Sequence, residues 1–174
     1  VVANPSAKDT SVTIRIWGSD KSGALALSTG STLTVASGKE TVLNLSAAAS
    51  GQDALYATVT GTDTPVAAIV RTVSMDGLTS KGSDYALPNN ASAKSLALYG
   101  LNGGDHATLY LYTSRKTDVT VSWIDSKGAQ QTNQQELKAN RASAIDLGDV
   151  PKSATGIAIA ASEPVSATAK ISDD

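Results

Sequence analysis

The sequence predicts an all-β chain made of two repeated antiparallel β-sandwich modules of the immunoglobulin-like kind, with almost no helix. Three observations predict this: apolar and polar residues alternate in short runs, turn-forming residues separate the runs, and the second half of the chain repeats the pattern of the first. Alternation with period two places one face of a strand in a core and the other in solvent. Short strands at regular spacing are typical of sandwiches and barrels.

The candidate strands share this alternation. In the first long run, Val12, Ile14 and Ile16 alternate with polar or aromatic residues, and in a later run Leu109 and Leu111 alternate with tyrosines. Similar runs lie at residues 33–35 and 42–45. Each run is long enough for a strand and too short for an amphipathic helix.

Turn signals separate these runs at intervals of roughly 8 to 12 residues. They combine Gly with Ser, Asp, Asn or Pro, which favour turns. The clearest turns lie at residues 18–23, 37–39, 50–52, 61–65, 102–105, 125–128 and 162–164. Trp17 and Trp123 precede equivalent turns, which favours a structural role for both. Residues 46–50 have a helical composition, but the stretch is too short for more than one turn.

The internal repeat appears when residues 36–60 are laid over residues 138–162, which needs no gap. A short deletion continues the match, and upstream residues 12–17 match residues 119–124. The superposed pairs are Leu43 with Ile145, Leu45 with Leu147, Leu55 with Ile157, Ala57 with Ile159, and Pro65 with Pro164. The sequence therefore predicts two copies of one module.

The module boundary is expected near Asn90, within residues 80–93, where Gly, Pro and Asn favour a linker. The first module then spans residues 1–90 and the second residues 91–174. The second module opens with an additional strand at residues 95–100 that has no counterpart in the first. Either the matching strand lies upstream of Val1, or residues 85–100 pair with the first module and complete it.

Composition excludes several classes of site. The chain has no cysteine and one histidine, His106, so disulfide frameworks, thiol nucleophiles and the usual zinc ligand sets are excluded. A net charge of −2 and a pI near 5.3 predict no nucleic-acid partner. Apolar runs are much shorter than the roughly 20 residues of a membrane span, so none is expected within this sequence.

No catalytic residue, metal ligand or cofactor is predicted. Asp105 and His106 are neighbours, and neighbours in a strand point to opposite faces, which favours a surface histidine over an acid–base site. The carboxylates fall one to a turn, which suggests no pair of the glycosidase type. Residues 146–149 could bind calcium weakly through mixed carbonyl ligands, but solvated turn residues are the favoured interpretation.

Aromatic residues gather on one predicted hairpin. If Gly103 and Gly104 form a tight turn, the flanking strands pair and direct their leucines to the core. The expected pairs are Leu98 with Leu109 and Leu96 with Leu111. The opposite side is the predicted partner or interdomain face, made of Tyr99, Leu101, His106, Tyr110 and Tyr112. Either the first module or the linker covers this face, or it is a platform for a protein or glycan; covering is favoured because buried rings stabilise the fold.

Several motifs together resemble uncharacterised actinobacterial secreted and cell-envelope proteins. They are Val1-Val2-Ala3-Asn4-Pro5-Ser6, Ile16-Trp17-Gly18, and residues 33–38, 42–45 and 65–68. In that group an N-terminal export or membrane segment precedes repeated β-sandwich domains. The second copy departs from the pattern, with Tyr112-Thr113 where the first has Pro5-Ser6. The resemblance implies an extracytoplasmic protein, secreted or anchored through a segment outside this sequence, and supplies no catalytic residues.

The function expected from these observations is a non-catalytic structural or protein-interaction segment of a cell-envelope protein, with a protein or a cell-wall glycan as partner. A glycan-binding accessory domain is the alternative, and an enzyme of unknown type comes third. An exposed strip of Tyr99, Tyr110 and Tyr112 would favour the glycan binder. A cleft with two facing carboxylates would favour the enzyme.

Overall fold

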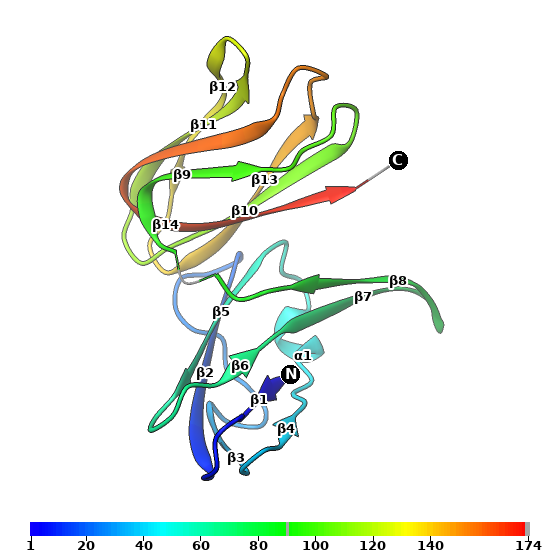
Figure 1. The fold of residues 1–174 in the computed structure, drawn as a ribbon, viewed down its shortest axis with the longest axis vertical. Coiled ribbons are helices and arrows are strands. Elements are labelled where there is room, and N and C mark those ends of the chain that lie inside the picture. Colours follow the sequence, from blue (N-terminus) through cyan, green and yellow to red (C-terminus); the bar gives the residue numbers. More distant parts are fainter. Residues whose placement is uncertain (90, 173–174) are drawn as a thin grey trace. The chain divides into compact units, whose positions relative to one another are not determined.

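The computed structural model describes residues 1–89 and 91–172. Strands hold 59% of the residues and helix 2%, so the chain is almost entirely β and forms several antiparallel sheets, as the alternation predicts. The chain divides into two compact units (Figure 1). Unit 1 comprises residues 1–16, 26–50 and 57–89, and unit 2 comprises residues 17–25, 51–56 and, among the described residues, 91–172. The expected boundary residue, Asn90, lies outside the described residues.

Unit 1 holds three small antiparallel sheets among its described residues. Its strands are β1 (Val2–Ala3), β2 (Thr10–Gly18), β3 (Thr32–Val35), β4 (Glu40–Thr41), β5 (Leu55–Gly61), β6 (Ala67–Ala68), β7 (Val70–Asp76) and β8 (Thr79–Ala86). The sheets have the orders β4-β1-β6, β3-β2-β5 and β7-β8. Two residues at the end of β2 and two at the start of β5 are grouped with unit 2.

The one helix in the described chain is α1 (Ser46–Ala49), a single turn with no buried residue. Its length agrees with the expectation from residues 46–50. No helix among the described residues is long and apolar enough to cross a membrane.

Strand β2 supplies much of the core of unit 1. Its buried side chains recur at every second position, which is the period expected for a strand with one covered face. The buried residues in unit 1 are Val2, Asn4, Thr10, Val12, Ile14, Ile16 and Val35. Asn4 is satisfied there, because its side-chain amide donates to the Lys8 and Val35 carbonyl oxygens at 2.8 and 3.0 Å.

The linker prediction for residues 80–93 is wrong in its first half, because those residues form a strand. Strand β8 pairs with β7 from Val70 opposite Ala86 to Asp76 opposite Thr79. Gly77, with φ of 59°, occupies the turn. Polar residues dominate β8 and all of it is exposed, so its composition resembles that of a linker. Figure 1 shows this hairpin extending from the rest of unit 1.

Unit 2 contains the larger sheet. Its strands are β9 (Ala93–Tyr99), β10 (His106–Thr113), β11 (Thr117–Asp125), β12 (Gly128–Leu137), β13 (Arg141–Asp149) and β14 (Gly156–Ser172). They follow the order β12-β11-β14-β10-β13, and β9 also pairs with β14. The first part of β14 lies between β11 and β9, and its last part pairs with β10. Figure 1 shows β14 bending between these two parts.

The core of unit 2 draws apolar side chains from both parts of the sheet. Leu109 and Leu111 come from β10, Val119 and Val121 from β11, and Ile157 from β14; all are at most 2% exposed. Leu96 and Leu98 of β9 are partly buried and pack against this core. The four leucines predicted to face the core therefore do so.

The predicted pairing of β9 with β10 is wrong. Leu98 lies opposite Ile157, and Leu96 opposite Ile159, both on β14. The glycine turn does not close a hairpin, because Gly104 donates its N–H to the Val150 carbonyl at 2.8 Å and Val150 donates to the Asp105 carbonyl at 2.7 Å. Of the two alternatives for the additional strand, pairing of residues 85–100 with the first module is wrong for β9, because β9 pairs with β14 in unit 2.

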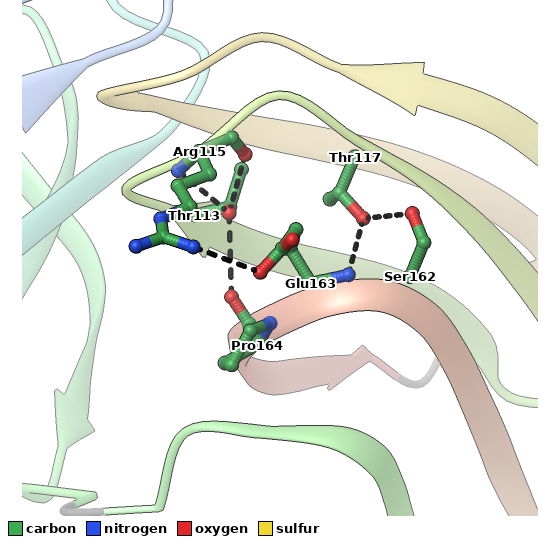
Figure 2. A network of polar contacts seen from close by, with 6 residues as sticks. All are labelled: Thr113, Arg115, Thr117, Ser162, Glu163 and Pro164. Carbon is green, nitrogen blue, oxygen red and sulfur yellow. Dashed lines mark hydrogen bonds and ion pairs between the residues drawn. The ribbon is translucent and has the colours of Figure 1, made fainter.

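A buried polar network ties the turn between β10 and β11 to the bend of β14 (Figure 2). Thr113 is 1% exposed. Its hydroxyl donates to the Arg115 carbonyl oxygen at 2.7 Å, and the Pro164 carbonyl oxygen lies 3.3 Å from the same hydroxyl. The hydroxyl of Thr117 accepts from the Glu163 N–H at 2.9 Å. Because buried polar groups are costly when unpaired, these bonds fix the bend in one conformation.

Candidate functional site

Strand β10 carries three of the five residues predicted for the partner or interdomain face. Ala107, Leu109, Leu111 and Thr113 are buried, and the intervening residues are half-buried. The side chains of His106, Thr108, Tyr110 and Tyr112 therefore define the outer face of β10. The alternation seen in the sequence thus places Tyr110, Tyr112 and His106 on one face.

Small side chains flank the two tyrosines of this face. Tyr112 lies between Ala142 of β13 and Ser166 of β14, and Tyr110 lies opposite Ala144 on β13. Short neighbours leave room for a tyrosine ring to lie against the sheet or to receive another ring. On the outer face of β10, the two tyrosines therefore form a row that small side chains flank on the neighbouring strands.

Tyr112 is covered by two aromatic rings from the first half of the chain. Its ring stacks on that of Tyr56, with centroids 3.8 Å apart and an interplanar angle of 6°. Trp17 lies 5.2 Å from Tyr112 and 5.7 Å from Tyr56, tilted against both. Burial raises the pKa of the Tyr112 hydroxyl, and the neighbouring Tyr56 raises it further. We call Trp17, Tyr56 and Tyr112 the aromatic cluster; all three residues belong to unit 2.

Hydrogen bonds hold the loop that follows Trp17 within unit 2. Ser22 donates its hydroxyl to the Ala139 carbonyl at 3.0 Å, and Gly23 donates its N–H to the Asn140 carbonyl at 3.1 Å. The guanidinium of Arg141 also donates to the Ser19 carbonyl. The aromatic cluster is thus part of a fixed junction between these loops and the sheet.

A shallow polar cavity of about 280 Å³ lies beside β13 in unit 2. It is lined by Ser19, Asp53, Gln135, Glu136, Lys138, Arg141, Ala142, Ser143 and Ala144. The lining combines carboxylates with cationic groups, and the Glu136 carboxylate is paired with Lys116 at 2.6 Å. Such a surface can hydrogen-bond a polar ligand, but it lacks the apolar walls that usually enclose a bound small molecule.

His106 sits between two exposed carboxylates. Its Nε2 lies 3.0 Å from Asp146 and its Nδ1 lies 3.6 Å from Asp149. Because the carboxylates contact opposite ring nitrogens, one metal ion cannot bind all three groups in this arrangement. Among the described residues there is no group of three or more His, Cys, Asp or Glu side chains able to hold a metal. Asp146 accepts from the Gly148 N–H at 2.8 Å, which is the geometry of a turn carboxylate.

Tyr99 and Leu101, the other two residues predicted for this face, lie elsewhere. Tyr99 is opposite Gly156 at the end of β9 and is 70% exposed. Leu101 packs against the core of unit 2. Both were misplaced because the face was derived from a hairpin that does not form.

Sequence reasoning did not find Tyr56 as a partner of Tyr112. Tyr56 lies on the side of β5 opposite Ala57 and Val59, which are half-buried, so the alternation could have indicated the side on which its ring lies but not the partner of that ring. The sequence predicts solvated turn residues at Asp146 and Asp149, with weak calcium binding as the lesser alternative, and the structure places both exposed carboxylates beside His106.

Comparison with known proteins adds a family but no activity. Over residues 1–174 the sequence matches a family described as a family of unknown function, DUF5719. The chain belongs to this family. No curated protein and no solved structure matches the sequence.

Proposed function

We propose that the two units are tandem copies of one β-sandwich module. The strand registers support this. Val2 lies between Thr41 and Ala68 in unit 1, and Leu111 lies between Ser143 and Ala167 in unit 2. The sequence alignment superposes Thr41 on Ser143 and Ala68 on Ala167, and it places Val2 over Leu109, two residues before Leu111. Likewise, Thr10 of β2 is opposite Val35 of β3 in unit 1. Their counterparts in the alignment, Thr117 of β11 and Leu137 of β12, are opposite each other in unit 2.

The turns support the same proposal. Gly38 and Asn140 occupy equivalent positions, and both adopt the left-handed conformation, with φ of 64° and 55°. Each donates its N–H to a carbonyl at the end of the equivalent strand: Gly38 to Asn4 at 3.0 Å, and Asn140 to Thr113 at 2.9 Å. Asn140 is the one non-glycine residue with positive φ in the described chain, so an unusual backbone conformation recurs in both copies.

We further propose that the chain is a non-catalytic structural and protein-interaction segment of an extracytoplasmic cell-envelope protein. The β7-β8 hairpin carries this proposal. Its tip residue Leu78 is fully exposed, Tyr85 is 59% exposed and Val73 is 42% exposed. A two-stranded hairpin is marginally stable alone in water, and exposed apolar groups of this kind mark interaction surfaces. A protein partner that covers the hairpin supplies the missing burial. The extracytoplasmic location rests on the family resemblance of the sequence motifs.

The aromatic cluster favours this function over glycan binding. The Tyr56 and Tyr112 rings cover one face of each other, and Trp17 lies against both rings, so the cluster offers a sugar less ring surface than three separate rings would. The observation that favours the glycan alternative is the polar cavity beside β13, where Asp53, Gln135 and Arg141 offer hydrogen-bonding groups.

Site-specific cross-linking tests the proposed function. A photoreactive amino acid replaces Leu78 at the hairpin tip, or Lys127 at the exposed turn between β11 and β12 as a matched control. We expect irradiation of producing cells to give a discrete protein adduct from position 78 and none from position 127, and Val73→Ser to weaken that adduct. No adduct from position 78, together with retention of the chain on protein-free cell-wall polysaccharide, would replace the interaction segment with the glycan binder.

A further inference from the structure

Strand β5 has a free edge where its counterpart in unit 2 is occupied. In unit 2, residues 156–160 of β14 have β11 on one side and β9 on the other. The repeat superposes β5 on this part of β14, and β2 on β11. In the described structure β5 pairs with β2 alone and is the last strand of its sheet. One strand position is therefore filled in unit 2 and open in unit 1.

Side-chain burial differs in the same way. Strand β9 places Leu96 opposite Ile159, which is 1% exposed. The counterpart of Ile159 in unit 1 is Ala57, which is only half-buried, as is Val59 on the same side of the strand. The face that β9 covers in unit 2 is therefore incompletely covered in unit 1.

The β5 edge also lacks the usual protection against strand addition. Natural edge strands carry charges, prolines or bulges that discourage another strand from pairing. The edge strands of unit 2 carry charged residues, namely Lys94 on β9, Glu136 on β12 and Arg141 on β13, whereas β3, at the other edge of the sheet that holds β5, carries none. The sequence of β5, Leu-Tyr-Ala-Thr-Val-Thr-Gly, has no charge and no proline and consists largely of good strand formers.

We propose that residues 57–61 of β5 accept an extended polypeptide strand from a protein partner, antiparallel to β5, as β14 accepts β9. The partner strand carries apolar side chains at alternate positions, which cover Ala57 and Val59, and its backbone pairs with the free edge. The proposal rests on the tandem repeat proposed above and not on the hairpin surface. One difference limits the length of the added strand. Ala54 is the counterpart of Gly156, and its methyl group would block a strand as close as β9 is to Gly156, so the added strand ends before Ala54.

Titration of the full chain with synthetic peptides tests this proposal. The probe peptide has the sequence of residues 91–100, and the control peptide has serine in place of both leucines. We expect the probe to shift the amide NMR signals of residues 57–61 in a saturable way, and the control to bind at least about tenfold more weakly. Ala57→Lys should weaken probe binding by a similar factor. Thr60→Lys, on the exposed opposite face of the same strand, should leave it unchanged.

The proposal is overturned if residues 57–61 do not respond, if both peptides bind alike, or if the probe perturbs only residues 156–160 by displacing β9. Sedimentation of the chain without peptide tests a different occupant. If the chain forms a dimer in which β5 is protected, a second copy occupies the edge, and the proposal of a separate protein partner is overturned. If Ala57→Lys does not fold, the comparison of the probe and control peptides on the unmodified chain still tests the proposal. Failure here leaves the cross-linking result at Leu78 unaffected, so the two proposals are tested separately.

Discussion

Tyr112 is held by aromatic contacts that Tyr99 lacks, and this difference predicts unequal effects of substitution. Tyr112→Ala removes the stack on Tyr56 and the contact with Trp17. We expect the free energy of unfolding to fall by about 1 to 3 kcal/mol, below the range for a fully buried ring. Tyr99→Ala, at a 70% exposed position, should cost less than about 1 kcal/mol. Urea unfolding of both variants checks this, and equal losses would contradict a structural role for the cluster.

The raised pKa of Tyr112 predicts a specific alkaline sensitivity. Burial first and Tyr56 second raise this pKa, so the folded chain holds the phenolic proton more tightly than the unfolded chain does. The resulting stability is complete below the ordinary tyrosine pKa of about 10 and is lost as pH rises through the folded-state pKa. Between about pH 9 and about pH 11, the free energy of unfolding should fall less in Tyr112→Phe than in the parent. Parallel declines in urea unfolding would show that Tyr112 does not contribute.

At the residue scale, the sequence was sufficient to place side chains on faces but not to identify their neighbours. The alternation along β10 assigned Tyr110, Tyr112 and His106 to one face because side-chain direction depends only on the local backbone. Tyr56 reaches Tyr112 through the tertiary fold, and no local pattern records that contact. Leu101 failed for a related reason: it follows the end of β9, where alternation no longer applies.

At the element scale, Gly156 controls how closely β9 approaches β14. A Cβ atom at this position would lie 2.6 Å from the Leu98 carbonyl oxygen and 2.9 Å from the Tyr99 ring. Because the first of these atoms belongs to the backbone, Gly156→Ala should push β9 away and lower the free energy of unfolding by about 1 to 3 kcal/mol. Ala160→Ser, at an exposed position of the same strand, is the control. Hydrogen exchange that is unchanged along β9 in Gly156→Ala would contradict the close contact.

Strand existence was easier to predict than strand pairing. The two leucines of β9 indicate a strand with one buried side, and such a strand can pair with any neighbour that continues the core. The decisive contacts are those of the glycine turn with Val150, which lies far along the chain. Strand β8 was not predicted, because a polar strand that is exposed on both sides shows no alternation of apolar and polar residues.

At the scale of the whole molecule, the alignment agrees with the strand pairings only in part. Thr10 and Thr117 have equivalent partners, whereas Leu43 and Leu45 lie outside the strands and their counterparts Ile145 and Leu147 lie in β13. Some positions that the alignment superposes keep the same burial, as Val35 and Leu137 show, whereas Leu55 is 38% exposed and its counterpart Ile157 is fully buried. The alignment could not indicate that segments 17–25 and 51–56 group with unit 2, since that grouping depends on contacts and not on sequence order.

Residue-resolved amide hydrogen exchange of the isolated chain most directly tests whether unit 1 is a copy of the unit 2 module with one strand position open. In an antiparallel strand, successive amides point alternately to the two neighbouring strands. Residues 156–160 should therefore be protected throughout, whereas along residues 57–61 every second amide should exchange rapidly because it faces the free edge. Uniform protection of residues 57–61, equal to that of residues 156–160, would contradict the open position and the repeat-based inference built on it.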